Sequence, residues 1–452
     1  GLNSLYANTT GSGNTAIGGG NTLDNNTTGS NNVAMGNNAL DANTTASDNT
    51  ALGAGAMFAT TTGCQNVAVG RKALFTNITG DNNTAIGHCA LKVSTTDNNT
   101  ALGHSALIAT TTGFGTAVGF NAMKANTTSS GGTAMGYQAL CSNTTGDDNT
   151  AFGLETLSKN TTGSSNTAVG RDALEVNTSG IENSAFGKKA LLTNTTGNSN
   201  TAVGVAALQQ NTTASCNTAV GFVSLINNTT GTDNVAVGMC SLYSNTTASY
   251  NSAFGFEAGC SNTTGTENTS LGYQANKCGT TGSYNTTVGN SAGCQLTTGS
   301  SNTLIGHIAG RTGSPATITT QSGAIVIGNN SSTNAYIKVA WSVTSDLRDK
   351  TEIENVPHGL DFVNNLNPIK YKFKTSREDD TPHGDIKYGF GAQDILALEG
   401  DNPVIIDNKQ DDILKITNDH LIPVLVNAIK ELKAENDSLI TRIEVLENEW
   451  SK

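Results

Sequence analysis

The segment from Ser345 to Lys350 places a hydroxyl and an amine within six residues that also hold two acids and an arginine. A serine hydroxyl is a poor nucleophile at neutral pH until a base removes its proton, and a lysine amine can be that base only where burial or neighbouring charge lowers its pKa. Five residues separate the two, which places them about 140° apart on a helix and on opposite faces of a strand. A bend in the chain, or packing by a neighbouring subunit, is therefore needed to bring them together. The alternative interpretation is an exposed charged turn.

This charged segment begins where the composition of the chain changes. Residues 1–344 contain 11 Lys and Arg and 14 Asp and Glu, whereas residues 345–452 contain 13 and 22. The net charge of the chain is −12. Nucleic acids and anionic membrane surfaces bind clustered Lys and Arg, so neither kind of partner is favoured for this chain. No run of 18 apolar residues occurs, which argues against membrane insertion. Three parts are expected: a repeat shaft over 1–310, a final coil and neck over 311–344, and a charged module over 345–452.

The first part is an internal repeat. The motif Asn-Thr-Ala-apolar-Gly recurs with its glycine from Gly18 to Gly306 at a period of 17 residues, with single slips at Gly36, Gly103 and Gly119. Gly1 lies in the same register, so the chain is expected to be a piece of a longer protein. This period is too short for a helical hairpin, and Thr, Val and Ile at alternate positions favour strands. Each repeat is predicted to be one coil of a β-solenoid.

The alternation along each predicted strand separates two faces. Thr and the apolar residue point one way, and Ala and Gly point the other. Because Val replaces Thr in several coils, we expect the Thr face to lie inside the coil. The Ala and Gly face would then allow close approach of another backbone and form a subunit interface.

Residues 1 to about 310 resemble the left-handed β-roll heads of trimeric autotransporter adhesins, which carry a similar core of apolar residues, Ala and Gly. The resemblance implies a homotrimeric β-roll. Those heads use shorter coils.

The other features of the shaft are interpreted as structural. The recurring Asn-Thr-Thr-Gly has the form of a glycosylation acceptor, but a tight corner is the favoured interpretation. The eight cysteines occupy different registers, which predicts free thiols or isolated bonds. The histidines after register glycines are expected to lie too far apart to share a metal, and the scattered glutamates predict no glycosidase site. No metal and no cofactor are expected. The histidines are His88, His104 and His307, and the glutamates are Glu155, Glu175, Glu182, Glu257 and Glu267.

Residues 345–452 carry four motifs in order. They read SDLRDKTEI, LDFVNNLNPIKYKFK, KYGFGAQDI and HLIPVLVNAIKELKAEN. In this order they resemble the self-cleaving intramolecular chaperone module at the C-terminus of phage endosialidases and many tail fibres. The resemblance implies a small α+β domain that drives trimer assembly and then releases itself. It also implies that Ser345 is the nucleophile, that Lys350 is the general base, and that the cut falls between Thr344 and Ser345.

The last helix carries an apolar seam stepping by three and four residues, which is typical of a coiled coil. Ile and Leu at these positions with a single Asn favour two strands in isolated peptides, whereas the module and the shaft both imply three. The seam consists of Ile422, Leu425, Ile429, Leu432, Asn436, Leu439, Ile443 and Leu446.

Together these features predict a trimeric viral tail or surface fibre, made in the host cytoplasm and carried on the virion. Its expected partners are two further copies of the chain and a host-surface glycan or receptor. Apart from self-processing by the serine and lysine, no turnover enzyme is expected. The alternative is a cellular trimeric adhesin that keeps the C-terminal module as a permanent clamp. A depolymerase would require a carboxylate cluster in the shaft.

Overall fold

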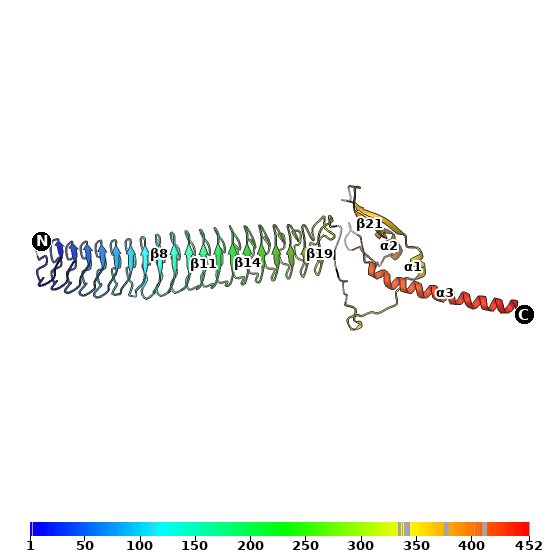
Figure 1. Cartoon of the computed structure of the whole chain (residues 1–452), viewed down its shortest axis with the longest axis horizontal. Coiled ribbons are helices and arrows are strands. Elements are labelled where there is room, and N and C mark those ends of the chain that lie inside the picture. Colours follow the sequence, from blue (N-terminus) through cyan, green and yellow to red (C-terminus); the bar gives the residue numbers. More distant parts are fainter. Residues whose placement is uncertain are drawn as a thin grey trace. The chain divides into compact units, whose positions relative to one another are not determined.

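The computed structural model describes residues 1, 3–111, 113–332, 336, 338, 344–374, 379–401, 403–408 and 414–451. The chain divides into two compact units, Gly1–Asn329 and Asn330–Lys452. Figure 1 shows the first as a stack of coils and the second as a small mixed domain with a long C-terminal helix. Of the expected neck, residues 333–335, 337 and 339–343 lie outside the described residues.

The first unit is a parallel β-solenoid, as the 17-residue period predicted. Each coil contributes one strand of three residues, and each strand pairs in parallel with those of the adjacent coils. The register is uniform: Ala168 of one coil lies opposite Ala151 and Ala185 of its neighbours. The predicted last coil is also present, because Ile325–Ile327 pairs with Thr303–Ile305. The strands are β1 (Thr15–Ile17), β2 (Val33–Met35), β3 (Thr50–Leu52), β4 (Val67–Val69), β5 (Thr84–Ile86), β6 (Thr100–Leu102), β7 (Thr116–Val118), β8 (Thr133–Met135), β9 (Thr150–Phe152), β10 (Thr167–Val169), β11 (Ser184–Phe186), β12 (Thr201–Val203), β13 (Thr218–Val220), β14 (Val235–Val237), β15 (Ser252–Phe254), β16 (Thr269–Leu271), β17 (Thr286–Val288), β18 (Thr303–Ile305) and β19 (Ile325–Ile327).

The core of the solenoid is made of alanine and leucine. Ala168 of β10, and Ala173 and Leu174 of the following turn, are fully buried, and the same positions are buried through most coils. The first and third residues of the strand point outward; Val169 is 37% exposed. The predicted assignment of faces is therefore wrong. In most coils the leucine of the following turn fills the interior, so the strand position holds only a methyl group. Where glycine replaces that leucine, at Gly293 and Gly310, the strand position holds the larger Thr287 and Leu304.

The register glycine does permit a close backbone approach, but the approaching backbone is that of the next coil. Gly170 has φ of +128°, and a Cβ at this position would lie 2.7 Å from the carbonyl carbon and oxygen of Gly187. An L-residue with a side chain would be strained by its conformation and blocked by its neighbour. The glycines thus set the stacking of coils rather than a contact between subunits.

The asparagine of the Asn-Thr-Ala motif forms a buried ladder along the shaft. Asn183 donates its backbone N–H and its Nδ2 to Oδ1 of Asn166, at 3.0 and 3.1 Å, and Nδ2 of Asn166 also donates to the carbonyl of Gly180 at 2.9 Å. Each buried amide therefore joins one coil to the next, so the cost of burying it is offset by hydrogen bonds.

A second ladder uses the asparagine of Asn-Thr-Thr-Gly. Nδ2 of Asn177 donates to Oδ1 of Asn160 at 2.7 Å and to the carbonyl of Gly180, three residues on in its own coil, at 3.0 Å. The predicted corner is confirmed. Asn160 and Asn177 are fully buried, so neither side chain is accessible to a glycosylating enzyme in the folded shaft.

The second unit is the α+β domain that the charged module predicted. The 3₁₀ turn η1 (Leu347–Asp349) and helix α1 (Leu360–Asn364) precede an antiparallel hairpin, and the final helix follows a second, short strand pair. The remaining elements are β20 (Pro368–Lys374), β21 (Pro382–Phe390), α2 (Ala392–Glu399), β22 (Ile406–Asp407), β23 (Lys415–Ile416), the 3₁₀ turn η2 (Asn418–His420) and α3 (Leu421–Trp450).

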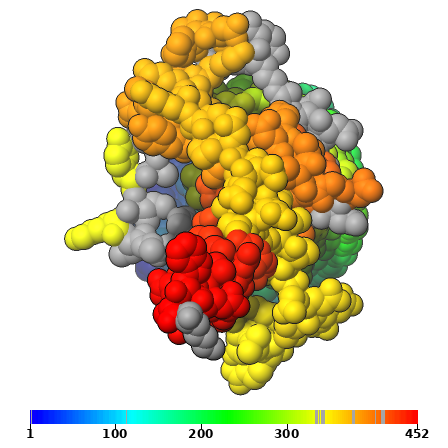
Figure 2. All heavy atoms as spheres, turned by 90° about the vertical axis from the view of Figure 1, so that its right-hand side faces the viewer, coloured from blue at the N-terminus to red at the C-terminus, as the bar shows by residue number. Residues whose placement is uncertain are grey.

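A small apolar cluster holds this unit together. Phe362 of α1, Ile395 of α2 and Ile406 of β22 pack with Leu421 and Val424 of α3. The first turns of α3 are thus buried in the domain, whereas its later turns project away from it (Figure 1). In Figure 2 the last turns of the helix, in red, face the viewer. The helix has one end that is fixed by packing and another that contacts nothing else in the described chain.

Candidate functional site

The predicted serine and lysine contact each other. Lys350 Nζ donates a hydrogen bond of 2.7 Å to Ser345 Oγ. The turn η1 lies between them and reverses the chain, so the required bend is supplied within one chain.

The bend is held by its own charged residues. Asp346 caps η1: its Oδ1 accepts from the backbone N–H of Arg348 at 2.9 Å, and its carboxylate pairs with the Arg348 guanidinium at 2.5 Å. Lys350 closes the turn through its N–H to the carbonyl of Leu347 at 3.2 Å. The hydrogen bonds from Arg348 lower the pKa of the Asp346 carboxyl, and the same contact raises the pKa of Arg348. The acids and the arginine of the segment are thus part of a local turn motif.

The pair is open to solvent. Thr344, Ser345 and Lys350 are all exposed in the single chain. With the lysine protonated, its Nζ donates to the serine oxygen; with the amine neutral, the hydroxyl can donate its proton to Nζ across the same contact. The arrangement can therefore transfer a proton between Ser345 and Lys350. Covering the pair would lower the local dielectric and favour the neutral amine that a general base requires.

The predicted seam lies on an uncovered face of α3. Every apolar seam residue is exposed, from 43% at Leu425 to 66% at Ile429, and Asn436 is exposed as well. The buried residues of the helix, Leu421, Val424 and Ala428, form a different stripe that packs onto the domain. The helix thus has two apolar faces, and only one of them has a partner among the described residues.

Two residues of α3 that the sequence did not single out connect it to α1. Glu431 accepts from the backbone N–H of Leu360 at 2.6 Å, which caps α1, and Asn427 donates to the carbonyl of His358 at 3.0 Å. Asn427 and Glu431 are four residues apart and therefore lie on one face of α3, which the sequence could have indicated. Their contacts with the start of α1 could not be predicted, because α1 is about 70 residues away in the sequence.

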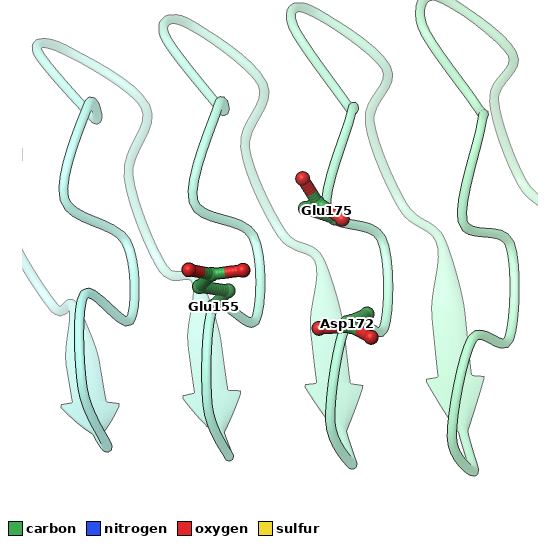
Figure 3. A group of neighbouring side chains, drawn as sticks. All are labelled: Glu155, Asp172 and Glu175. Carbon is green, nitrogen blue, oxygen red and sulfur yellow. The ribbon is translucent and has the colours of Figure 1, made fainter.

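The shaft contains a carboxylate cluster that the sequence analysis missed. Glu155, Asp172 and Glu175 bring one carboxylate oxygen each within 4.8 Å of one another, from adjacent coils (Figure 3). Glu155 and Asp172 are 17 residues apart, so they occupy the same position in adjacent coils. The stacking of the coils therefore brings them together, although they are distant in the sequence. Lys159 pairs with Glu175 at 3.2 Å and Arg171 with Asp172 at 3.3 Å. Nearby cations thus balance two of the three acids.

The expectation that the histidines lie too far apart is wrong for one pair. His88 and His104 occupy neighbouring coils, and their ring centroids are 4.9 Å apart. The stack continues through Phe120 and Tyr137 at 5.3 and 5.4 Å. All four residues directly follow a register glycine, so one column of the shaft exposes a ladder of stacked rings.

The eight cysteines are free thiols. Of the two alternatives expected from the sequence, free thiols or isolated disulfide bonds, the structure has the first.

Comparison with known proteins finds a family match within the charged module. Residues 345–402 match the family model described as the chaperone of endosialidase, and this match begins at Ser345. It agrees with the resemblance that the four motifs carry. Neither the curated proteins nor the solved structures gave a match. Among the described helices, none has the length and apolar character needed to cross a bilayer.

Proposed function

We propose that this chain is one subunit of a homotrimeric phage-type fibre whose C-terminal module assembles the trimer and then cuts itself free between Thr344 and Ser345. The observation that carries the proposal is the 2.7 Å contact between Lys350 Nζ and Ser345 Oγ at the start of the segment that matches the chaperone of endosialidase. The shaft of repeated coils supplies the fibre.

The proposed reaction uses groups that are adjacent in the chain. Neutral Lys350 accepts the proton of Ser345 Oγ, and the oxygen attacks the carbonyl carbon of Thr344. The C–N bond between Thr344 and Ser345 breaks, the amine nitrogen takes up a proton, and an ester joins Thr344 to Ser345 Oγ. Water then hydrolyses this ester. The products are a shaft that ends in the Thr344 carboxylate and a module that begins with the Ser345 amine.

Assembly supplies the trigger in this proposal. Ser345 and Lys350 are exposed in the single chain, so water has access to both side chains before assembly. Association of three modules would cover the segment and favour the neutral amine. Cutting would then follow assembly, which is the order that a chaperone requires.

The module can also set the register in which three shafts pair. The coils are nearly identical, so three chains could pair one coil out of register at little cost in free energy. A clamp at one end fixes the register of all the coils. Host attachment by the shaft and a place on the virion are the roles expected for such a fibre.

Freshly purified full-length chain tests the proposal. Analytical ultracentrifugation should give the mass of three chains, and denaturing mass spectrometry should find a shaft fragment ending at Thr344. A trimer that stays uncut would favour the second function, a permanent trimer clamp on a surface adhesin. A monomer would contradict both.

A further inference from the structure

The outward face of the solenoid carries an apolar stripe without interruption. The third residue of every strand from β1 to β19 is apolar, although this position points away from the core. Exposed fractions along it include 45% at Met35, 42% at Phe186 and 60% at Ile327. The stripe consists of Ile17, Met35, Leu52, Val69, Ile86, Leu102, Val118, Met135, Phe152, Val169, Phe186, Val203, Val220, Val237, Phe254, Leu271, Val288, Ile305 and Ile327.

The size of the stripe exceeds what a single soluble chain exposes by chance. Eighteen steps of about 4.8 Å give a length of roughly 85 Å, and a width of about 10 Å gives roughly 850 Å². The largest apolar patch of a typical monomer is about 300–600 Å², whereas one side of a standard protein interface buries about 800 Å². The stripe therefore has the area of an interface.

The two sides of this stripe carry opposite charge. We call the two residues before each Asn-Thr-Ala asparagine the leading edge, and the residue directly after each register glycine the trailing edge. The leading edge holds eight acids and no base, and the trailing edge holds three bases, three histidines and no acid. The acids are Asp48, Asp81, Asp97, Asp147, Asp148, Glu182, Asp233 and Glu267; the bases are Arg71, Arg171 and Lys188.

We propose that the stripe is the surface through which copies of this chain contact one another, with the shafts parallel and their strand faces directed toward a common axis. The proposal rests on the homotrimer of the proposed function and specifies its interface. It also replaces the interface expected from the sequence, because the alanine column is buried within each coil.

A second copy is the occupant that fits this surface. The stripe repeats once per coil over the full set of strands, and another copy of the chain offers the same repeat over the same length. Rotation about an axis parallel to the shaft places the leading edge of one copy beside the trailing edge of the next, so the acidic edge faces the edge that carries the bases. Within one coil level, Glu182 of one copy would face Lys188 of the next. An antiparallel pair would place leading edge against leading edge and bring acids together, which is unfavourable.

Site-specific photo-crosslinking of the full-length chain tests this interface. A benzophenone amino acid replaces Leu271 in β16, where it conserves an apolar side chain. The matched control replaces Thr264, an exposed residue of the Asn-Thr-Thr-Gly corner in the same coil. Circular dichroism and ultracentrifugation of both proteins before irradiation establish that each folds and assembles.

The expected result is crosslinked chains from the Leu271 position and single chains from the Thr264 position on a denaturing gel. Mass spectrometry should map the crosslinks to coils next to β16, between residues 254 and 288. Crosslinks to coils near β4 would show an antiparallel pair and overturn the proposed arrangement.

The outcomes also separate this inference from the function on which it rests. A trimer that crosslinks at Thr264 but not at Leu271 would overturn the stripe as the interface and leave the trimeric fibre intact. A wild-type chain that forms no oligomer would overturn both.

Discussion

Lys350 Nζ lies within 2.7 Å of Ser345 Oγ because a single 3₁₀ turn separates the two residues. A continuous helix or strand would have kept them apart. The turn depends on Asp346, which caps it and binds Arg348, so the charged residues of the segment have a structural role that is independent of any chemistry. The contact is complete within one chain, so in the proposed function assembly changes only its surroundings.

The buried alanine column predicts that enlarging it damages the coil itself. Ala168→Leu adds three carbons to a fully buried position between two neighbouring alanines, and overpacking of this kind costs about 1–3 kcal/mol. Hydrogen exchange should show faster exchange in residues 150–186. The control Thr162→Leu enlarges an exposed corner residue of the same coil, outside the apolar stripe, and should leave exchange in these coils unchanged. Equal protection in both variants would contradict the inward position of alanine.

The asparagine ladder predicts a specific cost for removing one amide. Asn166→Ala leaves the buried backbone N–H of Asn183 without its acceptor, which costs about 1–3 kcal/mol, whereas Nδ2 of Asn183 keeps its bond to the carbonyl of Gly197. We expect lower local stability, measured by hydrogen exchange of residues 166–200. Ser179→Ala, at an exposed corner position within the same residues, is the control and should have little effect. If the two variants behave alike, the ladder does not stabilise the stack.

The exposed seam of α3 predicts that charge on it prevents assembly. In the proposed trimer, Leu432→Asp with Leu439→Asp would bury carboxylates without partners, so light scattering should report single chains. Ala434→Asp with Thr441→Asp places the same charges two residues along, on the opposite side of the helix, where all residues are exposed. This control should remain trimeric. A seam variant that assembles normally would argue against the clamp.

The partly buried thiol of Cys260 predicts that the stability of the shaft depends on pH. Burial, with a smaller effect of the Glu257 carboxylate, raises the pKa of Cys260 from its ordinary value of 9.0 to about 11. Between these values the unfolded chain releases a proton that the folded chain keeps, so this thiol's contribution to stability is complete below pH 9 and falls as pH rises toward 11. At pH 8, iodoacetamide should modify the exposed Cys216 and Cys278 while Cys260 is spared. Rapid modification of Cys260 in folded protein would contradict the shift.

The period of the sequence was sufficient to predict the solenoid, but it did not decide which face points inward. Val in place of Thr was interpreted as burial, although β-branched residues favour a strand on either face. The small size of the alanine column was the better guide, since a narrow coil has little internal volume. The carboxylate cluster was missed for a related reason: Glu155 and Asp172 come together through the period of the repeat, so only an alignment of coils reveals them.

The fold class of the module and its closing helix were predictable, but its local geometry was not. The motifs specified the candidate residues Ser345 and Lys350, and the family match covers the same segment. Nothing in the spacing alone indicated a 3₁₀ turn, because the turn arises from the cap that Asp346 provides. The seam of α3 could be predicted from the spacing of its apolar residues. The second apolar stripe of the helix could not, because it is defined by packing against the rest of the domain, including α1.

Intact-mass spectrometry of freshly assembled wild-type, Ser345→Ala, Lys350→Ala and Lys350→Arg chains tests the central claim most directly. Arginine keeps the charge and can donate to Ser345 Oγ, but it cannot give up its proton to act as the base. We predict that the wild type separates into a shaft ending at Thr344 and a fragment beginning Ser-Asp-Leu-Arg. We also predict that all three variants stay whole and still form trimers. Cutting that persists at this bond in the Ser345 and Lys350 variants, or a wild-type trimer that remains uncut, would contradict the account.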